Sequence, residues 1–101
     1  MPKITVRVPH NLDPADAFVK VRPALEKTAQ DFQGQDLQLS TTANSATFSF
    51  KSLGFAIKGQ AEAKAGEVVV EVDLPFAAMM FKDKAEKGIE KNVRQALERQ
   101  G

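Results

Sequence analysis

Apolar and polar residues alternate over several short segments of the chain, which is the pattern of a β-strand with one buried face. Residues 46–51 show it most clearly, with Ala46, Phe48 and Phe50 on one side of the strand. A weaker segment precedes them at 37–41. Short polar turns separate the last four segments, so we expect an antiparallel meander with one covered face and one wet face. The five predicted strands are residues 3–8, 37–41, 46–51, 55–62 and 68–73.

Helical periodicity replaces the alternation in two places. The first helix begins at Asp13 and Pro14, an N-cap followed by a first-turn proline, and Gly34 predicts its end. Pro23 removes one backbone hydrogen bond inside this helix. Because Pro23 and Val19 both lie opposite the apolar arc, the freed carbonyl can face water and the helix continues past the proline. The arc consists of Ala17, Phe18, Val21, Leu25, Thr28, Ala29 and Phe32.

The second helix extends from residue 75 to about Arg99, and one stripe along it is apolar. The element order is β-α-β-β-β-β-α, which predicts an α+β fold with an antiparallel sheet of about five strands. Both helices are expected on one face of the sheet, as in a shortened helix-grip fold. Residues 1–101 are enough for a single domain and too few for two. The apolar stripe consists of Ala78, Phe81, Ala85, Ile89, Val93 and Ala96.

The composition of the chain indicates its cellular compartment and argues against some classes of binding partner. The chain has no cysteine and starts directly on a strand pattern without a secretory signal, so we expect a cytoplasmic protein. Its net charge of +1 argues against nonspecific nucleic-acid binding. Phe48, Phe50 and Phe55 could form a base-stacking platform only on an open sheet face, and here they share the face that the helices cover. The longest apolar run, residues 74–81, is far shorter than the roughly 20 residues of a membrane span, so no integral membrane segment is expected.

Candidate catalytic chemistry is sparse. His10 is the only histidine, and Asp13 and Asp16 follow it closely. It could be a general base oriented by a carboxylate, but its position favours a loop residue beside a helix N-cap. One histidine with scattered acids has no metal-ligand spacing, and the glycines form no phosphate loop. We therefore expect no catalytic residues, no metal and no cofactor, and hence no enzyme.

The start of the second helix carries more apolar residues than the core stripe requires. On an α-helical wheel the stripe lies within about 60° of Ala78, whereas Phe76 and Met80 lie at about 160° and 200°. We expect a surface that binds an apolar partner with anionic groups on it. Alternatively, Phe76 and Met80 belong to an irregular first turn that folds back over the sheet, or they are buried in a homodimer. The expected binding residues are Phe76, Met79, Met80, Lys84, Lys87, Lys91 and Arg94.

Three stretches of the chain resemble the small proteobacterial family of polyhydroxyalkanoic acid system proteins. They are Ile4-Thr5-Val6-Arg7-Val8-Pro9-His10-Asn11-Leu12, then Phe48-Ser49-Phe50 with Gly54-Phe55, and finally Leu74 through Lys82. The resemblance implies a cytoplasmic protein associated with the synthesis or storage of polyester granules. It implies no catalytic residue set, although His10 matches a motif position. Pro23 departs from the unbroken first helix expected for the family.

Three functions remain open from the sequence. The first is a non-enzymatic accessory or regulatory protein that contacts the granule surface or a granule protein through the start of the second helix. The second is a module that binds an acyl chain between the sheet and the C-terminal helix. Ala61, Ala63, Ala78 and Ala85 could leave room for such a chain or could simply permit close packing. The third is a protein–protein adaptor or homodimer that uses the same apolar residues.

Overall fold

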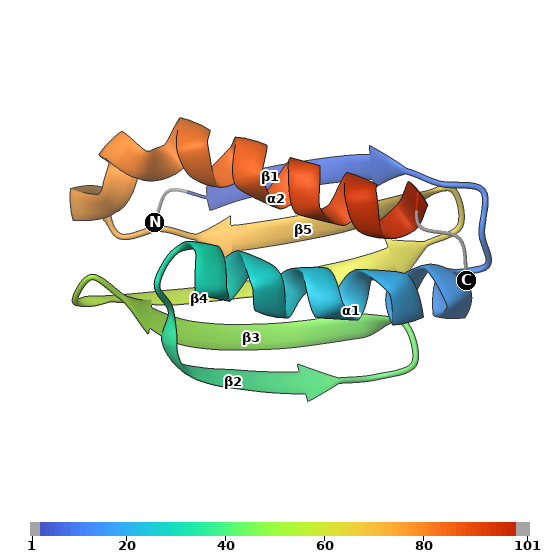
Figure 1. Cartoon of the computed structure of the whole chain (residues 1–101), viewed down its shortest axis with the longest axis horizontal. Coiled ribbons are helices and arrows are strands. Elements are labelled where there is room, and N and C mark those ends of the chain that lie inside the picture. The colour runs from blue at the N-terminus through green and yellow to red at the C-terminus, as the bar shows by residue number, and fades with distance from the viewer. Residues whose placement is uncertain (1–2, 99–101) are drawn as a thin grey trace.

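Five antiparallel strands form one open sheet with the spatial order β1-β5-β4-β3-β2 (Figure 1). The computed structural model describes residues 3–98, and β1 and β2 are the edge strands. The sequential strands β2 to β5 pair as a meander, and β1 adds the fifth strand at one edge by pairing with β5. The strands are β1 (Lys3–Pro9), β2 (Gln35–Thr41), β3 (Ser45–Ser52), β4 (Phe55–Lys64) and β5 (Glu67–Asp73).

Both helices lie on the same face of this sheet (Figure 1). Helix α1 (Pro14–Asp31) contacts β4, helix α2 (Lys82–Glu98) contacts β1, and the two helices contact each other. They run in opposite directions, so the end of α1 and the beginning of α2 lie at the same end of the molecule (Figure 1). The predicted fold class is therefore confirmed: an α+β fold with the order β-α-β-β-β-β-α and a one-sided helical layer, as in a shortened helix-grip fold.

The covered face of the sheet forms the core with the two helices. Ile4, Val6 and Val8 of β1 are buried, as the alternation predicts, while the residues between them are exposed. On the opposite face, Arg7 pairs with Glu67 at 2.8 Å and Lys3 with Glu71 at 3.4 Å. Charged and polar side chains therefore keep one face wet while the other carries the core.

Helix α1 includes Pro23 and continues to Asp31. Val19 and Pro23 are both exposed, so the structure confirms that they face away from the core. Asp13 holds the N-cap position ahead of Pro14, but its side chain makes no capping hydrogen bond.

The end of α1 is a Schellman motif. The N–H of Gly34 donates to the carbonyl of Ala29 at 2.7 Å, and the N–H of Gln33 donates to that of Gln30 at 2.9 Å. Gln33, with φ of 57°, is the left-handed residue, so Gly34 does not take the conformation for which glycine is usually chosen at a helix end. Gly34 is needed for space instead, because a Cβ there would lie 2.7 Å from the Ala29 carbonyl oxygen and 2.8 Å from the Phe50 ring.

The second predicted helix is divided into two segments. Residues Phe76–Phe81 form a 3₁₀ helix, η1, and the α-helix begins at Lys82. Pro75 starts η1, and its carbonyl accepts an i→i+3 bond from the Ala78 N–H at 2.9 Å. A 3₁₀ turn is common at the start of an α-helix. The predicted end of this helix, at Arg99, lies outside the described residues.

Candidate functional site

Five large apolar side chains are exposed on η1 and the β3–β4 turn. These two segments lie at the same end of the molecule (Figure 1). Within residues 3–98, only Val19 and Leu37 are exposed large apolar residues outside this group. Phe76 is 78% exposed, Met80 81% and Leu53 64%. We call this group the apolar tip: Leu53, Phe76, Met79, Met80 and Phe81.

The 3₁₀ geometry of η1 determines which side chains of the apolar tip face outward. Residues three apart in a 3₁₀ helix stand in one row. Ala78 and Phe81 form the row that faces the fold, because Ala78 is buried and Phe81 lines a pocket. Phe76 shares a second row with Met79, and Met80 belongs to the third.

Three expectations for this segment are therefore corrected. The α-helical wheel placed Phe76 and Met80 on one face, but the turn of about 120° per residue puts them in different rows. The alternative that both side chains fold back over the sheet is also wrong, since both are almost fully exposed. Phe81, assigned to the core stripe, is 39% exposed and lines the pocket instead of lying in the core.

The four predicted basic residues are all exposed on α2: Lys84, Lys87, Lys91 and Arg94. Arg94 forms an i,i+4 ion pair with Glu90 at 2.9 Å. Lys84, Lys87 and Lys91 make no ion pair with any residue of the described range 3–98. Lys84 and Lys87 thus remain available on this helix, whereas the positive charge of Lys91 helps to lower the pKa of Asp31.

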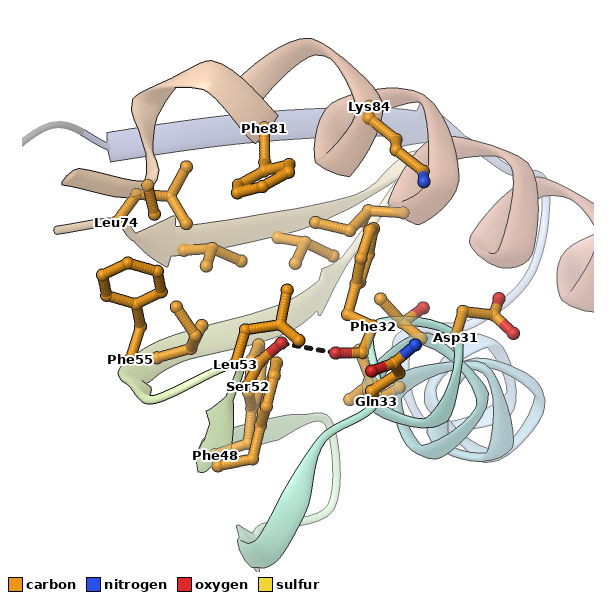
Figure 2. Close-up of a pocket in the computed structure, with 18 residues that line it drawn as sticks. Asp31, Phe32, Gln33, Phe48, Ser52, Leu53, Phe55, Leu74, Phe81 and Lys84 are labelled. Carbon is orange, nitrogen blue, oxygen red and sulfur yellow. Dashed lines mark hydrogen bonds between the residues drawn. The ribbon is translucent and has the colours of Figure 1, made fainter. Parts of the chain in front are cut away.

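A pocket with a volume of about 160 Å³ lies between the helices and the sheet at the same end of the molecule (Figure 2). Figure 2 shows Phe81 and Leu74 above it, Phe55 and Leu53 below, and Phe32 at the α1 side. The deeper walls are apolar side chains of three strands. They are Phe48, Phe50, Ile57, Val70 and Val72.

Phenylalanine side chains surround the pocket: Phe32, Phe48, Phe50, Phe55 and Phe81 line it. At the opposite end of the sheet Val8, Val68 and Ala63 lie opposite one another on three neighbouring strands and are buried. The sequence left open whether the small alanines make room for a ligand. Of these, Ala61, Ala63 and Ala85 belong to the packed core and do not line the pocket, whereas Ala78 does.

Two close contacts hold the pocket walls together. The Ser52 hydroxyl donates a hydrogen bond to the Phe32 carbonyl, which ties the end of β3 to the end of α1 (Figure 2). The Phe32 ring approaches α2 at Gly88, where an added Cβ would lie 3.2 Å from it. Gly88 is unfavourable inside a helix, and this close approach gives a packing reason for it.

The turn between β3 and β4 has an unusual residue at the pocket mouth. Leu53 and Gly54 form a two-residue hairpin loop and both have positive φ, 52° and 86°. Positive φ at both positions is characteristic of a type I′ turn, which favours Asn-Gly. A leucine there is strained, because its Cβ crowds the backbone in the left-handed region. The side chain of Leu53 lines the pocket.

Asn92 was not predicted from the sequence as a residue of interest. It is buried on α2, and its amide nitrogen donates to Thr28 Oγ1 at 2.9 Å and to an Asp31 carboxylate oxygen at 3.1 Å. Lys27 donates to the Asn92 Oδ1 atom at 3.2 Å. The hydrogen bonds from Asn92 and from Lys27 lower the pKa of Asp31, against a smaller opposing effect of desolvation. Asn92 of α2 bonds to all three of these α1 residues, so the cluster joins the two helices.

His10 uses both ring nitrogens in backbone contacts. Its Nδ1 accepts a hydrogen bond from the Leu12 N–H at 2.9 Å, so Nε2 carries the proton and donates to the Lys64 carbonyl at 2.7 Å. The His10 N–H also donates to the Gly66 carbonyl at 3.0 Å. No carboxylate within residues 3–98 orients the ring, and the histidine connects the loop after β1 to the β4–β5 hairpin.

The fold and the site define a small α+β protein with an apolar tip and a pocket beside it. A family model described as "Putative polyhydroxyalkanoic acid system protein" matches residues 4–97, and the chain belongs to this family. The resemblance inferred from the sequence is thereby confirmed. No helix within residues 3–98 is long and apolar enough to cross a membrane.

Comparison with curated proteins gives no match. Among solved structures, the chain is similar to one titled "Crystal structure of Ara h 8.0201", with 14% identity over 95% of this chain and 97% of that one, and a TM-score of 0.47. It is also similar to the protein TTHA0849 from Thermus thermophilus, with 11% identity over 95% of this chain and 92% of that one, and a TM-score of 0.38.

Proposed function

We propose that this protein is a non-enzymatic accessory protein of polyhydroxyalkanoate storage that docks on the polyester granule through its apolar tip. The observation that carries the proposal is the gathering of Leu53, Phe76, Met79, Met80 and Phe81 at one end of the fold. Contiguous exposed apolar side chains rimmed by polar residues mark interaction surfaces. Family membership supports the polyester as the partner.

The composition of the apolar tip suits a chemically irregular surface. Methionine is unbranched and adaptable, so Met79 and Met80 can fit an uneven polymer face. Lys84, Lys87 and Lys91 on α2 carry charges that no ion pair within residues 3–98 neutralises. These lysines can pair with anionic groups at the granule surface, such as carboxylate chain ends or lipid head groups, in the way that basic residues support interfacial helices.

The non-enzymatic part of the proposal is supported by the single histidine. Both nitrogens of the His10 ring already bond to the backbone, so the ring is not poised as a general base. The cytoplasm, where such granules lie, is the compartment we propose.

Co-sedimentation of the purified protein with isolated polyester granules tests the docking proposal. Met80→Glu places a charge in the apolar tip, and Val19→Glu is the matched control, because Val19 is 71% exposed on α1 away from the tip. We expect the parent and Val19→Glu to sediment with the granules and Met80→Glu to remain in solution. Equal sedimentation of all three would contradict docking through the apolar tip.

A homodimer would use the same apolar residues. The molecular mass of the protein in solution distinguishes this alternative from granule docking. If the apolar tip is a dimer interface, the parent protein is a dimer in solution and Met80→Glu is a monomer, whether or not granules are present. We expect the parent to be a monomer by light scattering at micromolar concentration. A dimer abolished by Met80→Glu would replace the granule by a second copy of this chain as the partner.

A further inference from the structure

The pocket beside the apolar tip has a chemistry of its own. We propose that it binds a short-chain carboxylate of the hydroxyalkanoate class, with the alkyl part in the apolar interior and the carboxylate at Lys84. The inference does not depend on granule docking; only the choice of hydroxyalkanoates among short carboxylates rests on the family. Three independent features of the pocket support it.

The first feature is size. A dry cavity of about 150 Å³ in an engineered protein takes benzene, so a volume of about 160 Å³ fits roughly six to eight non-hydrogen atoms. That is the size of one short hydroxyalkanoic acid and far below that of a long fatty acid. The walls formed by Phe50, Ile57 and Val72 are apolar and suit an alkyl group.

The second feature is the charge at the rim. Lys84 lines the pocket and, within residues 3–98, makes no ion pair (Figure 2). Asp31 also lies at the rim, but its carboxylate already bonds to Lys27 at 3.2 Å and to Asn92 at 3.1 Å. The uncompensated charge is therefore positive, and it selects an anionic head group. Asp31 and Gln33 offer acceptors for a hydroxyl group on the same ligand.

The third feature is the strained turn. Leu53 has φ of 52°, where asparagine would be relaxed, and its side chain lines the pocket mouth. Because Leu53 is 64% exposed, the burial of its side chain in the free protein offsets little of the backbone strain. Backbone strain at such a position is typical of residues held for binding. A bound alkyl group would cover this leucine.

An amide-shift titration by NMR with 3-hydroxybutyrate, in solution without granules, tests the proposal. We expect concentration-dependent shifts at Phe50, Ile57 and Val72, with millimolar affinity, as suits a ligand of so few atoms. Methyl 3-hydroxybutyrate is the uncharged counterpart, and it should bind about fivefold more weakly. Absence of shifts at the pocket, or equal affinity for the ester, would overturn the inference.

Two variants with matched controls locate the contacts. Lys84→Gln should weaken 3-hydroxybutyrate binding about fivefold, whereas Lys58→Gln, at an exposed position of β4 outside the pocket, should not. Leu53→Asn should weaken binding about threefold or more while raising the melting temperature, so unfolding cannot explain the loss. Unchanged affinity in both Lys84→Gln and Leu53→Asn would overturn the assignment of the site.

The carboxylate could come from the free acid or from the end of a polyester chain. The linear ester dimer of 3-hydroxybutyrate distinguishes the two sources. Tighter binding of the dimer than of the monomer assigns the pocket to a chain end, and weaker binding assigns it to the free acid. If the pocket binds neither, granule docking through the apolar tip still stands, and loss of docking leaves this titration unaffected.

Discussion

The side-chain amide of Asn92 on α2 donates a hydrogen bond of 2.9 Å to the hydroxyl of Thr28 on α1, in the buried contact between the helices. The Thr28 hydroxyl in turn donates to the Ala24 carbonyl at 2.7 Å. Both polar groups are thus satisfied away from water, which buried polar groups require. This pair links α1 to α2, the helix that contributes Lys84 and Ile89 to the pocket.

Replacing Asn92 by alanine should lower the free energy of unfolding by about 1–3 kcal/mol, because it removes a buried hydrogen-bonded group. Urea denaturation measures the change. Thr28→Val keeps the shape of Thr28 without its hydroxyl. The two single variants and the double variant Asn92→Ala/Thr28→Val therefore form a double-mutant cycle. We expect a coupling energy of at least about 0.5 kcal/mol. Strictly additive effects would show that the hydrogen bond contributes nothing.

The pH dependence of stability should report on Asp31. Its pKa lies below the ordinary value of 3.8, chiefly because the Asn92 amide donates to its carboxylate. A group with a lowered folded-state pKa contributes stability above its unfolded-state pKa, here 3.8, and loses that contribution as the pH falls through the folded-state pKa. NMR titration of the Asp31 carboxyl carbon should therefore show a pKa nearer 3.8 in Asn92→Ala. The same low pKa in both proteins would contradict the assigned cause.

Gly59→Ala should destabilise the fold although alanine suits a strand better than glycine. The Phe48 ring lies over Gly59, and an added Cβ would be 2.5 Å from the ring and 2.7 Å from the Glu71 carbonyl oxygen. We expect a loss of about 2–3 kcal/mol from this overpacking. Gly54→Ala has open space and should cost only about 1 kcal/mol for its positive φ. A Gly59→Ala protein as stable as the parent would disprove the steric account.

Leu53→Asn should stabilise the free protein by about 0.5–1 kcal/mol. Asparagine tolerates the left-handed conformation that leucine resists, and Asn-Gly is the preferred type I′ sequence. Little apolar burial is lost, since Leu53 is mostly exposed. Thermal unfolding followed by circular dichroism measures the effect. A lower melting temperature would mean that Leu53 packs more tightly at the pocket mouth than its exposure indicates.

The fold was predictable from the sequence because apolar residues alternate with polar ones in strands 3–8 and 46–51. This period of two residues puts all the apolar side chains on one face of each strand, and that face must be the buried one. The same holds for the stripe from Ala85 to Ala96, which is buried as predicted. The division of the second helix was not predictable. An i→i+3 and an i→i+4 bond after Pro75 are both compatible with the residues of the segment, and contacts with the rest of the fold decide between them.

The candidate site was only partly predictable. Exposure of Phe76 and Met80 was expected, but for a geometric reason that proved wrong. The pocket is lined by side chains from both helices and three strands. No pattern within one segment of the sequence predicts how side chains from five separate elements come together. Two features of the chain do point to this region: Asn92 is a polar residue inside the apolar stripe, and the two-residue loop between paired strands places Leu53 where positive φ is required.

A single tryptophan at the apolar tip gives the most direct test of the central claim, because the chain contains no tryptophan or tyrosine of its own. Phe76→Trp reports on the apolar tip, and Val19→Trp is the control on α1. On addition of polyester particles, we predict a blue-shifted, intensified emission from the tryptophan at position 76 and no change from that at position 19. Unchanged emission at position 76, with the protein nevertheless bound to the particles, would show that another surface makes the contact.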